Sequence, residues 1–219
     1  MNPAELRNAI AKDLKPARPL LPPSTRALLL APLALATVVA VPSFYLFRPD
    51  LAELGVIAAW GLSFVEAAVG LAIVGLALRE SIPGRALSGG AVCLTVAVGL
   101  GLPLLVYVVT AQRFDIGVPP RAQLYVAYLC FRTSLGAAVP ALMATTVLVA
   151  RAYPLRPGVT GVLYGLGCGV IADAGLRLYC EFTMPSHVLT AHGGAIVAAM
   201  AIGPALARFT RSNGAIPPP

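Results

Sequence analysis

The chain has 219 residues, of which 58% are hydrophobic and 11% charged, with a mean hydropathy of +0.83 and a net charge of +7. This composition leaves no room for a soluble domain of ordinary size and is typical of a polytopic membrane protein. The basic residues flank apolar stretches rather than forming a separate basic face, which argues against direct binding of nucleic acid.

The N-terminal segment predicts a short amphipathic helix over residues 3–15, with Asn2 as its cap and Pro16 as its end. A helix of this length is marginal alone in water, so its apolar face needs a partner. That partner is either the membrane surface or a groove in a cytoplasmic protein. Residues 16–26 are proline-rich and predict an extended spacer. The apolar face consists of Leu6, Ile10 and Leu14.

Six apolar stretches follow, each long enough to cross about 30 Å of hydrocarbon as a helix. They are residues 27–47, 54–78, 86–111, 122–150, 157–178 and 188–207. The sequence therefore predicts an all-α fold, a bundle of six transmembrane helices over residues 27–209. We expect a cytoplasmic segment 1–26 before the bundle and a cytoplasmic tail 210–219 after it.

Lysine and arginine are unevenly divided between the two sides of the predicted bundle. Eleven lie on the side of the N-terminal segment, whereas the opposite side has five, namely Arg48, Arg113, Arg121, Arg132 and Arg177. Because short loops rich in Lys and Arg stay in the cytoplasm, both termini are expected there. The excess accounts for most of the positive net charge.

The four cysteines form no Cys-x-x-Cys pair, which argues against a thioredoxin-type oxidoreductase or a zinc ribbon. Cys93 and Cys168 lie within spans and are interpreted as small packing residues. Cys180 lies in an outer loop, and Cys130 lies at most about 12 Å below the same surface at 1.5 Å per residue. Two thiols from different helices thus approach one oxidising face. Their proximity is either coincidental or that of a redox- or metal-sensitive pair.

Three further donors follow Cys180 within twelve residues, namely Glu181, His187 and His192. Thiol, imidazole and carboxylate groups can together bind a borderline divalent metal. The spacing matches no standard zinc motif, so neither a metal site nor a cofactor is predicted, and these three residues remain candidates.

Charged residues inside the predicted spans are few. Asp173 and Arg177 are four residues apart on the fifth span, and Arg132 has a similar depth on the fourth. A carboxylate and a guanidinium in the membrane are expected to pair, either as a tie between these spans or along an ion path. Glu66 has no evident partner in its own helix. A transporter or proton channel that uses Glu66, Asp173 and Arg132 is the alternative function.

The N-terminal residues 6–20 read LRNAIAKDLKPARPL, which resembles the L-x-x-x-L-A-x-D-L-x-P-V-R-x-L opening of the NrsF-type family of six-span bacterial anti-sigma factors. Tyr179-Cys180-Glu181 stands where that family usually has His-Cys-Pro-Glu-Asp, so Tyr179 replaces the histidine and no Pro-Glu-Asp follows. Other similar segments occur in order, namely Arg48-Pro49-Asp50-Leu51, Ser81-Ile82-Pro83-Gly84-Arg85, Leu129-Cys130, Ala138-Val139-Pro140 and the small-residue run 158–169.

The resemblance implies a non-enzymatic protein of the bacterial inner membrane that holds an extracytoplasmic-function sigma factor inactive. It implies that two periplasm-facing cysteines, here Cys130 and Cys180, sense metal or oxidant stress. The expected partners are the sigma factor and membrane lipids, with no direct contact to nucleic acid. The sigma-binding segment implied by the resemblance contains Leu6, Ile10, Asp13, Leu14 and Pro16.

Overall fold

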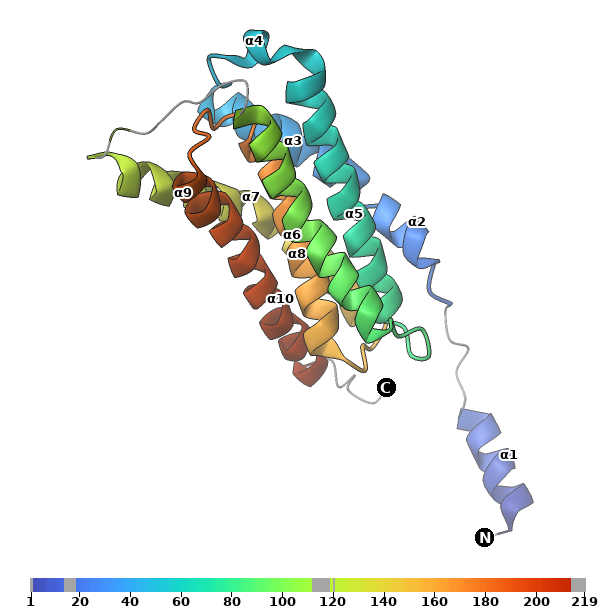
Figure 1. Cartoon of the computed structure of the whole chain (residues 1–219). Helices are drawn as coiled ribbons and strands as arrows, with labels where there is room; N and C mark the ends of the chain where they lie inside the picture. Colours follow the sequence, from blue (N-terminus) through green and yellow to red (C-terminus); the bar gives the residue numbers. More distant parts are fainter. Residues whose placement is uncertain (1, 14–18, 112–118, 120, 214–219) are drawn as a thin grey trace.

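The computed structural model describes residues 2–13, 19–111, 119 and 121–213. All regular secondary structure in this part of the chain is helical, and six helical segments are long and apolar enough to cross a membrane. The predicted all-α, six-span architecture is confirmed. In Figure 1, α1 and the end of α10 lie toward one end of the molecule, and α4 lies at the opposite end.

The spans are built from the following helices. The segment outside the bundle is α1 (Pro3–Asp13). The first three spans comprise α2 (Pro23–Leu28) with α3 (Ala31–Tyr45), then α4 (Leu51–Val56), η1 (Ile57–Gly61) and α5 (Leu62–Glu80), then α6 (Gly89–Ala111). The last three comprise α7 (Gln123–Ala150), then α8 (Pro157–Leu176), then α9 (Pro185–His187), η2 (Val188–Gly193) and α10 (Gly194–Asn213).

Helix α2 begins inside the segment that was predicted to be extended. Pro23 stands in its first turn, where the fixed φ of proline suits a helix and its missing N–H is not needed. The prediction of an extended spacer is therefore wrong for residues 23–26.

Helix α1 stands apart from the bundle in Figure 1. Its predicted cap is confirmed, because Asn2 Oδ1 accepts a hydrogen bond from Ala4 N at 3.1 Å and Asn2 N donates to Glu5 Oε2 at 3.0 Å. The side chains of Leu6 and Ile10 are 45% and 51% exposed. Leu14 and Pro16 of the predicted sigma-binding segment lie outside the described residues.

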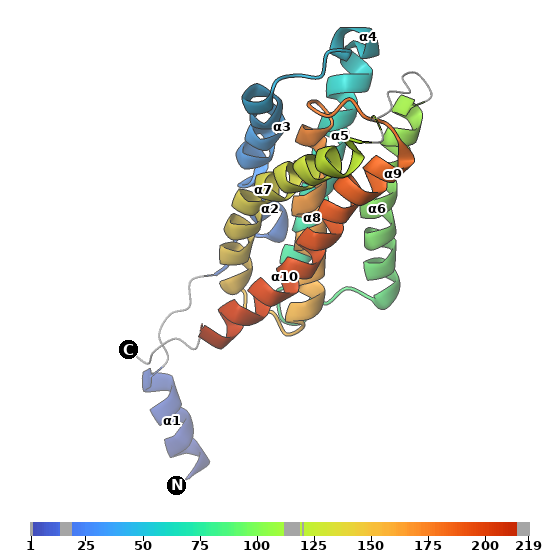
Figure 2. The same ribbon diagram turned by 90° about the vertical axis from the view of Figure 1, so that its left-hand side faces the viewer.

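Helix α8 runs through the middle of the bundle and is almost entirely buried among α3, α5, α6, α7 and α10 (Figure 2). Small residues allow this close packing. A Cβ atom at Gly165 would lie 2.3 Å from the backbone oxygen of Ala199 in α10, and one at Gly167 would lie 2.6 Å from the oxygen of Gly70 in α5. Such direct backbone contact is a common way for membrane helices to associate.

Two spans contain a π-helical turn, η1 in the second and η2 in the sixth. Just before η1, Gly55 has φ +76° and ψ 160°, a conformation that glycine adopts without a steric penalty. A π turn frees backbone carbonyls and changes which side chains share a face, and it often occurs at functional sites.

Candidate functional site

Cys130 and Cys180, which were predicted to lie near the same face of the bundle, are adjacent in the structure. Cys130 comes from α7 and Cys180 from the loop after α8; both are buried, and their sulfur atoms are 3.6 Å apart. A disulfide bond is about 2.05 Å long, so these are free thiols in contact. The hydrogen bond between the two sulfurs, followed by burial, raises the pKa of Cys180. Because the thiolate is the reactive form of cysteine, a raised pKa makes the Cys180 thiol less reactive than an exposed one.

Two histidines complete this cluster. His187 Nε2 lies 3.2 Å from Cys180 Sγ, and the ring of His192 lies 5.5 Å from that of His187, centroid to centroid. One donor atom from each of Cys130, Cys180, His187 and His192 can be chosen so that all four lie within 4.8 Å of one another. We call these four residues the outer cluster. The Glu181 carboxylate, also a sequence candidate, is not part of it.

A cavity of about 220 Å³ adjoins the outer cluster. Both cysteines line it, together with Tyr179, Glu181 and aromatic side chains that include Phe182. The thiols are therefore buried but lie at the wall of a space large enough for an ion or a small oxidant.

Arg48 holds the loop that carries Cys180 in place through hydrogen bonds. Its guanidinium forms a two-bond ion pair with the Asp50 carboxylate at 2.5 and 2.7 Å and donates to the backbone oxygens of Arg177 and Glu181 at 3.3 and 3.4 Å. Its own backbone N–H donates to Leu178 O at 3.0 Å. The loop between α3 and α4 thus holds the loop between α8 and α9 from both sides of Cys180.

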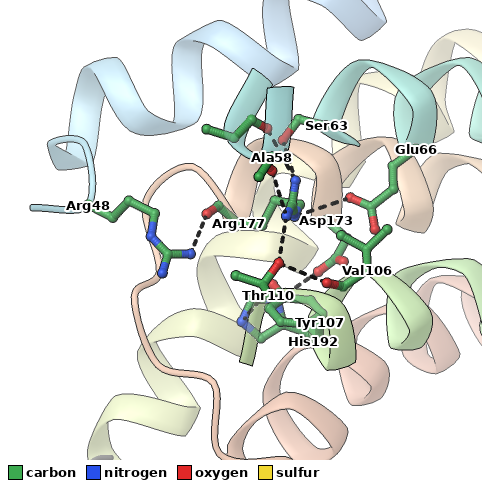
Figure 3. Close-up of polar contacts among 11 residues, drawn as sticks. Arg48, Ala58, Ser63, Glu66, Val106, Tyr107, Thr110, Asp173, Arg177 and His192 are labelled. Atoms are coloured by element: carbon green, nitrogen blue, oxygen red, sulfur yellow. Dashed lines mark hydrogen bonds and ion pairs between the residues drawn. The ribbon is translucent and has the colours of Figure 1, made fainter. Parts of the chain in front are cut away.

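His192 belongs to the outer cluster and also contacts polar groups inside the bundle. Figure 3 shows it beside Tyr107 and Asp173. Its Nδ1 lies 2.7 Å from Asp173 Oδ1, and its ring also forms a short hydrogen bond with the Tyr107 hydroxyl. The second carboxylate oxygen of Asp173 has no hydrogen-bond partner among the described residues. The cluster of thiols and imidazoles is therefore joined directly to a buried acid of the central helix.

Arg177, just past the end of α8, extends toward the second and third spans (Figure 3). Its terminal nitrogens donate four hydrogen bonds of 3.2 Å, to the backbone oxygens of Ala58 and Ala59 in η1 and to the hydroxyls of Ser63 and Thr110. The π turn supplies two of these acceptors. The end of the central helix is thereby tied to the second and third spans.

The predicted pairing of intramembrane charges is wrong in two respects. Asp173 pairs with His192, whereas the exposed Arg132 lies over the Tyr128 ring at 5.9 Å and does not tie the fourth span to Asp173. Glu66, for which the sequence showed no partner in its own helix, lies 3.8 Å from Nε of Arg177, just past the end of α8. Because Arg132 is separate from the other charges, the ion path through Glu66, Asp173 and Arg132 loses one of its three groups.

A family model described as NrsF, negative regulator of sigma F, matches residues 10–211. The chain belongs to this family. Searches among curated proteins and among solved structures found no match. Membership confirms the resemblance that the sequence motifs indicated and makes a sigma factor the partner of the chain. A family of negative regulators accords with the prediction that the chain acts by binding rather than by catalysis.

Three features of the site could not be read from the sequence. The π turn of η2, the participation of Tyr107 and Thr110, and the contact between Arg177 and Glu66 all depend on how helices are rotated about their axes. Hydropathy gives the depth of a residue in the membrane but not this rotation. The only available signal for the outer cluster was that its cysteines and histidines all fall near one end of the spans.

Proposed function

We propose that the chain is an anti-sigma factor of the bacterial inner membrane that holds an extracytoplasmic-function sigma factor through its N-terminal helix. An oxidant or a thiophilic metal in the periplasm changes the bonding of Cys130 and Cys180, and this change alters the affinity of the N-terminal helix for the sigma factor. The observation that carries the proposal is the contact at 3.6 Å between two sulfurs, one contributed by α7 and the other by the loop after α8. It occurs in a member of a family of sigma-factor regulators.

The half-exposed side chains of Leu6 and Ile10 support α1 as the docking element. Each fully buried aliphatic side chain contributes about 1.5–3 kcal/mol to association. Leu14 continues the same stripe, and the family resemblance adds Asp13 and Pro16 to the segment. A sigma factor that covers this stripe would thus gain a large part of its binding free energy from a few side chains.

The orientation rests on the uneven division of lysine and arginine. Fusions of a reporter at Arg151 and at Ser212 are expected to be active in the cytoplasm, and a fusion at Gly117 is expected to be active in the periplasm. A cytoplasmic signal at Gly117 would reverse the orientation and move Cys130 and Cys180 to the reducing side.

Transmission to the cytoplasm requires two arrangements of the bundle that bind the sigma factor differently. A disulfide would shorten the distance between the sulfurs from 3.6 Å to about 2.05 Å and draw α7 toward the loop before α9. A bound metal would instead hold both elements at a fixed spacing. A tenfold change in sigma affinity needs about 1.4 kcal/mol of preference for one arrangement, which is modest for a covalent or metal bond.

A reporter gene driven by the partner sigma factor tests the sensing role. Replacing Cys130 or Cys180 with Ser should abolish induction by oxidant or cadmium, and the double variant should behave like each single one because the pair acts as a unit. Cys93→Ser and Cys168→Ser are the matched controls and should respond normally. Normal induction in either outer-cysteine variant, with equal protein in the membrane, would contradict the proposal.

A further inference from the structure

We propose that the outer cluster is a four-ligand site for a borderline or soft divalent cation such as Zn²⁺ or Cd²⁺, with His187 and His192 as ligands beside the two thiolates. This inference deepens the proposed sensing role and rests on it for its biological meaning. The binding itself can be measured without any sigma factor.

The spacing of the donor atoms fits a tetrahedral ion. With Zn–S distances of about 2.3 Å and Zn–N distances of about 2.0–2.1 Å, the ligand atoms of such a site lie about 3.3–3.8 Å apart. The two sulfurs are 3.6 Å apart, His187 Nε2 is 3.2 Å from Cys180 Sγ, and no pair in the cluster exceeds 4.8 Å. Small rotations of the side chains would therefore complete the geometry.

The π turn brings the two histidines together. His187 and His192 are five residues apart, which in an α-helix separates side chains by about 140° around the axis. In a π turn, whose hydrogen bonds run from i to i+5, residues at this spacing lie on nearly the same face. The π turn η2 covers residues 188–193 and thus includes the segment between the two histidines. Its geometry turns both imidazoles toward the cysteines.

Groups around the histidines suit metal ligation. Metal-binding histidines usually give their other ring N–H to a carboxylate or carbonyl, and the contact of His192 Nδ1 with Asp173 at 2.7 Å is of this kind. The second ring nitrogen, Nε2, lies 3.3 Å from the Tyr107 hydroxyl, and a metal bound at Nε2 would replace that contact. The Nδ1 atom of His187 has no hydrogen-bond partner in the described part of the chain, so the one hydrogen bond given for that ring there is the contact of its Nε2 with Cys180 Sγ at 3.2 Å.

The donor set selects the class of ion. Two sulfurs and two imidazole nitrogens favour Zn²⁺, Cd²⁺ and similar ions over Mg²⁺ or Ca²⁺, which require oxygen ligands. A disulfide would use the thiols alone and would not explain why two buried imidazoles converge on them. The cavity of about 220 Å³ lined by Cys130 and Cys180 gives an ion a route to the site.

Cobalt binding to the full chain tests the site. The protein is purified in detergent, reduced, freed of metal and titrated with Co²⁺ as the probe. We expect one Co²⁺ per chain with the intense visible bands of tetrahedral coordination and thiolate-to-cobalt charge-transfer absorption. X-ray absorption of the Zn²⁺-loaded wild type should give two sulfurs at about 2.3 Å and two nitrogens at about 2.0–2.1 Å. A shell dominated by oxygen, a shell of sulfur alone, or the absence of stoichiometric binding would overturn the proposal.

Variants then assign the histidines. His187→Ala and His192→Ala should each lower Co²⁺ affinity at least about tenfold, and Asp173→Asn should lower it about 10- to 100-fold while tetrahedral binding persists. Cys93→Ser and Cys168→Ser should bind as the wild type does. Wild-type affinity in both histidine variants would overturn the proposal, and the X-ray absorption result decides the matter if a variant fails to fold.

The failure of this inference is distinguishable from that of the sensing role. If the reduced protein binds no metal but the outer-cysteine variants lose induction, the metal site is overturned and sensing by oxidation stands. If the tetrahedral site forms but induction survives in the cysteine variants, the site stands and the sensing role fails.

Discussion

Replacement of Arg177 by Met should strongly destabilise the bundle, because Arg177 joins the end of the central helix to two other spans. Its four hydrogen bonds reach Ala58, Ala59, Ser63 and Thr110. Methionine fills much of the same volume but cannot donate to any of these acceptors. The carbonyl oxygens of Ala58 and Ala59 would then lose their guanidinium donor in the interior.

The size of the effect follows from two contributions. Hydrogen bonds between membrane helices average about 0.6 kcal/mol each, which gives about 2.4 kcal/mol for four. Breaking a buried ion pair by removing one partner costs about 3–5 kcal/mol, and Glu66, which lies 3.8 Å from Arg177 and is fully buried, would lose its cation. The contributions overlap, so we expect a loss of about 2–5 kcal/mol, equivalent to about 30- to 4,000-fold in the folding equilibrium.

Trp60 provides the assay. It is the one tryptophan of the chain and lies in η1, next to the carbonyl of Ala59 that accepts from Arg177. Unfolding by sodium dodecyl sulfate in mixed micelles, followed by Trp60 fluorescence, measures the free energy of unfolding. Arg132→Met is the matched control, because this arginine is exposed and contacts the Tyr128 ring, and it should lose about 1 kcal/mol or less.

The double variant Glu66→Gln, Arg177→Met separates the two contributions. Removing the charge of Glu66 should restore part of the stability lost in Arg177→Met, because no uncompensated carboxylate then remains. The reasoning is refuted if Arg177→Met unfolds within 0.5 kcal/mol of the wild type, or if Arg132→Met is equally damaging.

Two further predictions concern the N-terminal helix and the outer loop. Ile10→Asp should abolish a two-hybrid signal between residues 1–26 and the sigma factor, because it puts a charge on the apolar stripe. Asn8→Asp puts the same charge on the opposite face of α1 and should preserve the signal. Equal signals from the two variants would exclude the apolar stripe as the anchor. Arg48→Ala should free the loop that carries Cys180 and raise the rate at which a maleimide labels that thiol at least about tenfold, because it removes the two hydrogen bonds from the Arg48 guanidinium to the backbone oxygens of Arg177 and Glu181, on either side of Cys180. Arg121→Ala, which removes an exposed arginine from the loop before α7, should leave the labelling rate unchanged. A normal rate in Arg48→Ala would show that the loop of Cys180 is held by other contacts.

Hydropathy was sufficient to predict the six spans and to place Cys130 and Cys180 near the same end of the bundle. It did not predict that the two sulfurs would be in contact at 3.6 Å, because that depends on which helices are neighbours. Depth was not enough for Asp173, which was expected to pair with a guanidinium. Its actual partner, His192, depends on the rotation of α8 and η2.

Packing sets that rotation through contacts that hydropathy does not contain. Gly165 and Gly167 face α10 and α5 respectively, at distances that no side chain larger than hydrogen allows. Once these faces are fixed, Asp173 lies beside His192. The π turn that brings His192 beside His187 likewise could not be predicted, because helix propensity ranks residues for helical backbone in general and does not distinguish a π turn from an α turn.

The most direct test of the account is the affinity of the sigma factor for the full chain in lipid nanodiscs, measured before and after exposure of the outer cluster to cadmium or oxidant. The account predicts that treatment changes the affinity of the wild type at least about tenfold and leaves that of Cys130→Ser and Cys180→Ser unchanged. An unaltered affinity in the treated wild type, or the same change in the cysteine variants, would contradict the claim that these two thiols control how tightly the cytoplasmic helix binds the sigma factor.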